Sequence, residues 1–317
     1  MSVARPSVNS VEPTEQLLQP TLFDIEPAEV LPLVQPHGRH VVVERESAPF
    51  VSLNAAAPRS AGAQNAVIEE SAAQASPARS SVAVLEAPAG PTWAHRLAVF
   101  DLETTGIDVE TSRIVTANVS IIDHLGDTRS RFDWIANPGI PIPPQASAVH
   151  GVSTERAVAE GRAAADVVAE IVDALTAALD EGLSIVIYNA PYDLTLLDRE
   201  ARRYGITPLR EPIPVVDPLV IDKALDRYRK GKRTLEAAAL HYEVELLDAH
   251  DAGADAIAAG RVAQALALTF EAELDITQAQ LHHSQVVWAR EQADSFQDYM
   301  RRTKDPTFTA RAGWPVA

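Results

Sequence analysis

The chain has 317 residues, of which 46% are hydrophobic, and its formal net charge is −17. This length suits one good-sized domain with appendages or two small domains, and the acidic balance argues against a broad electrostatic grip on nucleic acid. A local basic patch or a metal-mediated contact stays possible. The lack of cysteine excludes disulfides and thiolate metal sites. Because it also lacks a membrane-length apolar run and a signal-peptide pattern, we expect a cytoplasmic protein.

Residues 1–93 are expected to form a disordered extension, because they hold 11 of the 22 prolines, many Ala and Ser, and few aromatic residues. Such a composition buries too little apolar surface to offset the entropy of ordering. Within it, Gln19, Leu22 and Phe23 stand beside an acidic residue. Leu-Phe pairs in acidic tails are often anchors for an apolar pocket on a partner, and the alternative is an incidental apolar pair. The Gln-x-x-Leu-Phe spacing resembles the motif by which bacterial replication and repair proteins bind the sliding clamp.

From Trp93 onward, apolar segments alternate with turn signals, as in a folded domain. Three strands come first, and a tight turn joins the second to the third. Helices then alternate with strands, which implies a mixed sheet with helices packed on it. The last helix is expected to dock its apolar side chains on the domain. The predicted strands are 97–100, 114–122, 129–135, 184–187 and 215–216, and the main predicted helices are 163–179, 193–204, 235–241, 254–268 and 277–302.

Two carboxylates end the first predicted strand. Residues two apart on a strand face the same side, so Asp101 and Glu103 project together while Leu102 faces the core. Paired carboxylates repel unless a cation lies between them, and hard divalent cations prefer oxygen ligands. The pair therefore indicates a metal site, although a solvent-facing acidic strand end is the plain alternative.

Three more polar residues fall where chain segments open helices. Asp193 lies in the first turn of a helix that Pro191 helps to start. His250 and Asp255 are five residues apart, too far round for one helical face, so we expect His250 in a loop and Asp255 on the following helix. Each alone has an ordinary explanation, since Asp near a helix start is common and a lone His is usually not catalytic. Together they make a far more specific pattern.

With these motifs, residues 96–270 resemble the DnaQ-like exonuclease superfamily in its DEDDh branch, and within it the bacterial DNA polymerase III epsilon-subunit-like exonucleases. Asp101 and Glu103 match the first motif, Asp193 the second, and His250 with Asp255 the third. The sister branch has tyrosine four residues before its last Asp, where this chain has Asp251. The histidine branch therefore fits.

This resemblance implies a ribonuclease-H-like α/β fold with a mixed five-stranded sheet and 3′-to-5′ removal of nucleotides. It implies two Mg²⁺ or Mn²⁺ ions held by the four carboxylates, and chemistry agrees, because two such ions can activate water and stabilise the leaving group. A histidine with an ordinary pKa near 6.5 can accept a proton from that water, so His250 is the expected general base. The expected substrate contacts are Thr104, Gly106, His150 and Asn189.

A basic patch also lies in the domain, with six Lys or Arg residues against one acid between residues 223 and 233. It is expected to hold the phosphates of a strand, and the alternative is a solvated helix end with its loop. The predicted division of the chain is 1–93 extension, 94–270 exonuclease domain and 271–317 helical tail. The basic residues are Lys223, Arg227, Arg229, Lys230, Lys232 and Arg233.

The leading functional hypothesis is metal-dependent 3′–5′ hydrolysis of DNA ends, in replication proofreading or repair. The same residues also serve exoribonucleases of the RNase T and oligoribonuclease kind, because tolerance of a 2′-hydroxyl depends on pocket shape. A third hypothesis is a non-catalytic adaptor that binds nucleic-acid ends. Closely packed carboxylates argue against it, because unpaired buried charges cost stability.

Overall fold

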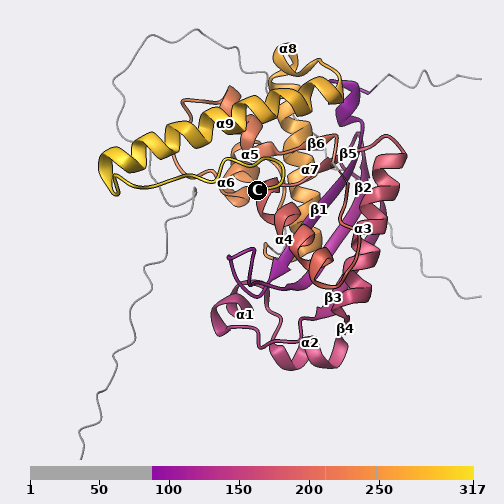
Figure 1. Ribbon diagram of the computed structural model, residues 1–317. Helices are drawn as coiled ribbons and strands as arrows, with labels where there is room; N and C mark the ends of the chain where they lie inside the picture. The colour runs from indigo at the N-terminus through magenta and orange to yellow at the C-terminus, as the bar shows by residue number, and fades with distance from the viewer. Residues whose placement is uncertain (1–87, 211, 247–248) are drawn as a thin grey trace, which may run out of the picture. The chain divides into compact units, whose positions relative to one another are not determined.

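The structure is a computed structural model that describes residues 88–317 except 211, 247 and 248. This part of the chain forms a mixed sheet between two layers of helices (Figure 1). The extension expected over 1–93, with Gln19, Leu22 and Phe23, lies outside the described residues as far as residue 87. The strands are β1 (Arg96–Thr104), β2 (Ile114–Asp123), β3 (Thr128–Asn137), β4 (Arg162–Ala163), β5 (Ser184–Val186) and β6 (Val215–Val216).

The described strands form one sheet in the order β4-β3-β2-β1-β5-β6. Strand β1 pairs antiparallel with β2 and parallel with β5, and β2 pairs antiparallel with β3. The five strands expected from the sequence are all present, so the predicted mixed sheet is confirmed. A sixth strand, β4, has two residues and adds in parallel to the edge of β3. It was not predicted, because Arg162 and Ala163 carry no strand pattern and pair only through their main chain.

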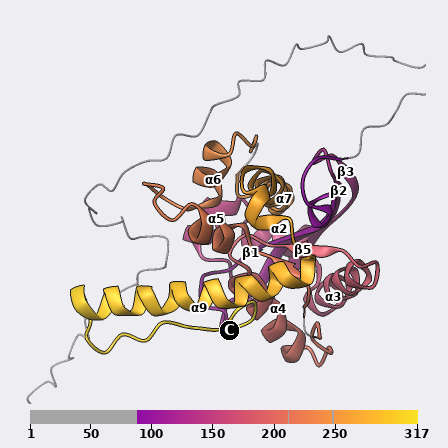
Figure 2. The same ribbon diagram turned by 90° about the horizontal axis from the view of Figure 1, so that it is seen from above.

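Helices cover both faces of the sheet, as Figure 2 shows, with α3 on one side and α6 and α7 on the other. Helices α1 and α5 are not among the helices predicted from the sequence. None of the described helices is long and apolar enough to cross a membrane. The helices are η1 (Thr92–Ala94), α1 (Pro144–His150), α2 (Thr154–Glu160), α3 (Ala164–Asp180), α4 (Ala190–Arg203), α5 (Pro218–Leu225), α6 (Leu235–His241), α7 (Ala252–Thr269), α8 (Glu271–Leu274) and α9 (Gln278–Thr303).

Strand β1 is buried on both faces, which explains its unbroken apolar run. Ala98, Phe100 and Leu102 belong to the core beneath α3 and α4, whereas Leu97 and Val99 belong to the core beneath α7. Successive strand residues alternate between the faces. Asp101 and Glu103 follow Leu97 and Val99 at the same two-residue spacing. Their side chains therefore point to the face of the sheet that α7 covers.

Helix α9 docks on the domain, as the sequence predicted. It begins with a capping box at Thr277, and its buried Leu281 joins the core beneath α7. Buried Gln285 accepts a hydrogen bond from the N–H of Asp217 at 2.6 Å and donates to the carbonyl of Val215 at 3.0 Å. The helix thus completes the hydrogen bonding of edge strand β6. Beyond α9 the chain returns to the domain and ends near α4 (Figure 1), where the N–H of Ala317 bonds to Thr195.

Glycine at position 260 lets α7 approach β1 and β2 closely. A methyl group there would lie 2.5 Å from Val99 and 2.6 Å from Ile122, both of which are buried. Real contacts of this kind do not fall below 3 Å, so the core side chains would have to shift. The position of α7, and with it that of His250 and Asp255 at its start, depends on this close packing.

Gly260→Ala should therefore lower the free energy of unfolding by about 1 kcal/mol or more, because overpacking a core outweighs the better helix propensity of alanine. Urea denaturation of the full chain measures this. Gly253→Ala is a matched control in the same helix, since the nearest atoms to a methyl group there belong to the end of the long, partly exposed Arg131 side chain rather than to the core. Equal stability of both variants would show that α7 does not depend on close packing at Gly260.

Candidate active site

Asp101 and Glu103 lie side by side at the end of β1, as predicted. Leu102 between them is 5% exposed and packs in the opposite core, whereas both acidic side chains are only partly buried. The pairing of β1 with β2 shifts register between Glu103 and Thr104. This irregularity ends the regular strand just after the second carboxylate, where the chain turns into the loop that carries Gly106.

Asp193 reaches the same point from α4. It is 3% exposed, and its Oδ1 accepts a hydrogen bond of 3.1 Å from the N–H of Leu102. That N–H belongs to the residue between Asp101 and Glu103. The bond fixes the third carboxylate against the first two, and it leaves the second oxygen of Asp193 available for another partner.

A buried carboxylate that the sequence analysis did not assign to the site, Asp217, holds the start of α4 in place. It accepts hydrogen bonds of 3.0 Å from the N–H groups of Asn189 and Ala190, and one of 3.1 Å from the N–H of Leu219. Its other contact is the indole N–H of Trp314 at 3.2 Å. Asn189 has a φ of 64°, a conformation that needs such support in a non-glycine residue. The available signal was an Asp directly after a strand and before Pro218.

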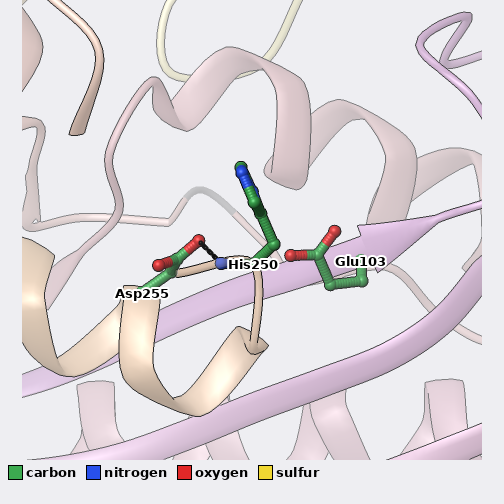
Figure 3. Close-up of side chains that lie close together, drawn as sticks. All are labelled: Glu103, His250 and Asp255. Atoms are coloured by element: carbon green, nitrogen blue, oxygen red, sulfur yellow. Dashed lines mark hydrogen bonds between the residues drawn. The ribbon is translucent and has the colours of Figure 1, made fainter. Parts of the chain in front are cut away.

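His250 and Asp255 complete the site from the start of α7. As expected, His250 lies in the preceding loop and Asp255 in the first helical turn. The backbone N–H of His250, which has a φ of 72°, donates to Asp255 Oδ2 at 3.1 Å (Figure 3). Ligand atoms of Glu103, His250 and Asp255 lie within 4.8 Å of one another. The imidazole also lies 3.7 Å from the carboxylate of Glu236 on α6, a neighbour that the sequence pattern did not reveal.

Burial raises the pKa of all four carboxyl groups, and neighbouring carboxylates add to the rise. Burial, followed by the charge of Asp193, raises the pKa of Asp101 well above its usual range. Burial and Asp255 raise the pKa of Glu103 to about 8. Burial also raises the pKa of Asp193, against the opposing effect of backbone hydrogen bonds, and that of Asp255 to about 6. Without a cation the group therefore retains protons near neutral pH.

The residues fit a divalent cation. Asp255 Oδ1 is buried and has no hydrogen-bond partner among the described residues. An unpaired buried carboxylate oxygen is costly unless a proton or a metal ion satisfies it. The donor set of Asp101, Glu103, Asp193 and Asp255 offers only carboxylate oxygens, which suit hard cations. These four side chains would hold the metal, and the sequence predicted them as its ligands.

The predicted substrate contacts Thr104 and Gly106 lie in the loop after β1. The Thr104 hydroxyl is 2.8 Å from the carbonyl of Gly106 and 2.5 Å from the hydroxyl of Tyr192, which itself donates to Gly106 at 2.6 Å. Tyr192 immediately precedes Asp193, and sequence analysis gave it no role. The two hydroxyls gather at the carbonyl of Gly106 and tie the loop to α4, so their present contacts shape the loop.

His150 and Asn189, the other predicted contacts, lie at the ends of elements that border the site. His150 ends α1, and its Nδ1 accepts the N–H of Val152, while its buried Nε2 has no partner in the described part of the chain. Burial, with a smaller effect of His250, lowers the pKa of His150 and favours the neutral ring. Asn189 precedes α4 and uses its N–H on Asp217. Whether these side chains bind substrate stays a prediction.

Comparisons with known proteins place the chain among nucleases. A family model described as exonuclease (RNase_T) matches residues 98–263. A DNA polymerase III subunit epsilon-like protein of Rhodobacter capsulatus is 39% identical over 109 residues, which are 34% of this chain and 15% of that protein. A PolC-type DNA polymerase III of Lacticaseibacillus paracasei is 29% identical over 169 residues, which are 53% of this chain and 11% of that protein. The chain thus spans a small part of these relatives.

Among solved structures, the zinc-bound complex of E. coli exonuclease I with single-stranded DNA matches with a TM-score of 0.50 at 21% identity. The match covers 57% of this chain and 42% of that chain. This similarity concerns the fold alone, and it confirms the expected ribonuclease-H-like architecture.

The raised carboxylate pKa values predict how pH and metal affect stability. Because Glu103 and Asp255 bind protons more tightly in the folded chain than in the unfolded chain, metal-free stability should fall as pH rises from about 6 to about 8. Mg²⁺ replaces these protons and binds only the folded site, so it should raise the melting temperature more at pH 8 than at pH 6. Thermal melts with Mg²⁺ and with chelator measure this. Asp255→Asn should reduce the effect, Asp298→Asn on α9 should preserve it, and an equal Mg²⁺ response at both pH values would contradict the account.

Proposed function

The chain belongs to the RNase_T exonuclease family, and on that premise we propose that it hydrolyses DNA from the 3′ end and releases nucleoside monophosphates in replication proofreading or repair. The observation that carries this proposal is the convergence of four carboxylates and one histidine from β1, α4 and the start of α7. The polymerase-related relatives favour DNA as the polymer. An exoribonuclease remains the second candidate, because the same residues serve both polymers.

In the proposed reaction, water attacks the terminal phosphodiester and the 3′ oxygen of the preceding nucleotide leaves. Two Mg²⁺ or Mn²⁺ ions, when bound, neutralise the developing charge and acidify the water. Asp101, Glu103, Asp193 and Asp255 would hold these ions. The bound cations would offset the burial and the carboxylate charges that raise the pKa of Asp101 and Glu103.

His250 is the proposed general base. Its half-exposed ring can reach a water at the carboxylates, and the carboxylate of Glu236, at 3.7 Å from the imidazole, can help to orient the ring. The backbone bond from His250 to Asp255 keeps the ring next to the metal ligands. A base held in this way acts on the water without binding the metal itself.

The direct test is degradation of single-stranded DNA and RNA labelled at either end, in Mg²⁺, in Mn²⁺ and in chelator. We expect metal-dependent loss from the 3′ end, faster for DNA than for RNA. Asp101→Asn should abolish it, because the metals lose a ligand. His250→Gln should lower kcat by about 10²- to 10⁴-fold with little change in DNA binding, since it removes only proton transfer.

Two matched substitutions on α9 control this assay: Asp298→Asn and His283→Gln, both at exposed positions, should leave the rates unchanged. Degradation from the 5′ end, or full activity of Asp101→Asn, would contradict the proposal. Faster loss of RNA would favour the exoribonuclease. Binding of ends without any cleavage would favour the adaptor.

We also propose that Gln19, Leu22 and Phe23 recruit the enzyme to a sliding clamp. The support is the motif's spacing in an acidic, proline-rich segment. Leu22→Ala with Phe23→Ala should abolish binding of the full chain to a bacterial clamp in surface plasmon resonance, and it should leave hydrolysis of short oligonucleotides intact. Unchanged clamp binding, or no binding by the unsubstituted chain, would remove this role.

A further inference from the structure

The loop between α5 and α6, residues 226–234, presents an aromatic side chain to solvent among cations. Tyr228 is 83% exposed, which makes it one of the two most exposed large hydrophobic side chains in the described part of the chain. Arg227, Lys230 and Lys232 are exposed around it, and none of their side chains has an ion pair or hydrogen bond among the described residues. In a chain of net charge −17, such a cluster of unpaired cations is unusual.

Two other residues of the predicted basic patch, Arg229 and Arg233, are not available to a ligand. Buried Asp222 binds Arg229 at 2.6 Å and Arg233 at 2.8 Å, and it accepts the hydroxyl of Tyr242 at 2.7 Å. The two arginine side chains are only 8% and 14% exposed. The patch therefore consists of an inner set of two arginines that build the loop, an outer set of three cations, and Lys223, which lies on α5.

The inner set gives the loop a fixed shape. Arg229 donates to the carbonyl of Lys232 at 3.1 Å, and Arg233 donates to the carbonyl of Asp226 at 2.6 Å. From the domain side, the Tyr188 hydroxyl donates to the carbonyl of Arg233 at 2.8 Å. The backbone that carries Tyr228 is thus tied at several points. The exposed ring of Tyr228 does not shield the hydrophobic core from solvent. Because the backbone beneath it is held by hydrogen bonds, the ring is already positioned to bind a partner.

The loop leads directly to the catalytic segment. It ends at Thr234, which caps α6, and the first turn of α6 carries Glu236, the carboxylate 3.7 Å from His250. A strand whose 3′ end reaches the carboxylates therefore has the loop as a neighbouring surface. Arginine and lysine pair with phosphates, and bases stack on aromatic rings without sequence preference.

We propose that the 226–234 loop is a second contact for single-stranded nucleic acid, with a base stacked on Tyr228 and phosphates paired with Arg227, Lys230 and Lys232. The contact holds the part of the strand that lies upstream of the 3′ end. Because the 3′ end is placed in the proposed exonuclease site, this inference rests on the proposed function. It supplies the positive charge that the acidic active site lacks. The recognised features are a phosphate backbone and an unpaired base.

Binding of a 5′-fluorescein oligodeoxythymidylate of about 20 nucleotides, measured by anisotropy in chelator, tests this contact without hydrolysis. Tyr228→Ala in the full chain should raise the Kd about fivefold or more, and Tyr228→Trp should retain affinity, because stacking needs only an aromatic face. Leu240→Ala is the matched control, since Leu240 is also 83% exposed and lies on α6. It should leave the Kd unchanged.

Salt dependence tests the cations separately. Lys230→Gln should reduce the slope of log affinity against log salt by about 0.7, the value for one phosphate contact on a single strand. Lys304→Gln, at another exposed lysine just beyond α9, should not change the slope. Equal Kd values for Tyr228→Ala and Leu240→Ala, or equal slopes for both lysine variants, would overturn the proposal.

These outcomes are distinguishable from failure of the proposed function. If the unsubstituted chain binds the oligonucleotide through Tyr228 but releases no nucleotide in Mg²⁺, the exonuclease proposal fails and the loop contact stands. If it degrades DNA from the 3′ end and Tyr228→Ala binds normally, the loop contact fails and the exonuclease proposal stands.

Discussion

The site brings four carboxylates together at the end of the buried strand β1. Their mutual repulsion is the constraint that the surrounding structure must satisfy. Burial raises the pKa of all four groups, and the charges of Asp193 and Asp255 raise those of Asp101 and Glu103 further. A folded chain holds such a group only if the surrounding structure fixes it or a cation neutralises it. The arrangement is thus costly without a metal ion and becomes favourable with one.

The surrounding structure fixes the group through the backbone rather than through positive side chains. The N–H of Leu102 binds Asp193, the N–H of His250 binds Asp255, and Asp217 secures the turn that begins α4. Backbone donors orient a carboxylate without filling the space where a cation would lie. Behind Asp217, Gln285 of α9 and the indole of Trp314 extend this support into the C-terminal segment. The last helix therefore serves the active site as well as the core.

Local patterns in the sequence were sufficient to predict five of the six described strands and several of the acidic and imidazole side chains that the fold brings together. Asp101 and Glu103 could be identified because the two-residue period of a strand places them together, and the five-residue spacing of His250 and Asp255 requires a loop and a helix. Partners that are distant in sequence could not be identified in this way. The support of Asn189 by Asp217 joins residues 28 apart. Likewise, charge counting could not separate Arg229, which binds buried Asp222, from Arg227, which faces solvent, because only the fold decides which cation turns inward.

The most direct test of the metal site is anomalous diffraction from a crystal of the full chain soaked in Mn²⁺. The account predicts anomalous peaks bounded by Asp101, Glu103, Asp193 and Asp255, with the His250 imidazole close by but not coordinated. Asp255 Oδ1, a buried oxygen with no hydrogen-bond partner among the described residues, should then contact a metal ion. An absence of peaks at these carboxylates, or a single ion ligated by the His250 ring, would contradict the assignment of four metal ligands and a free general base.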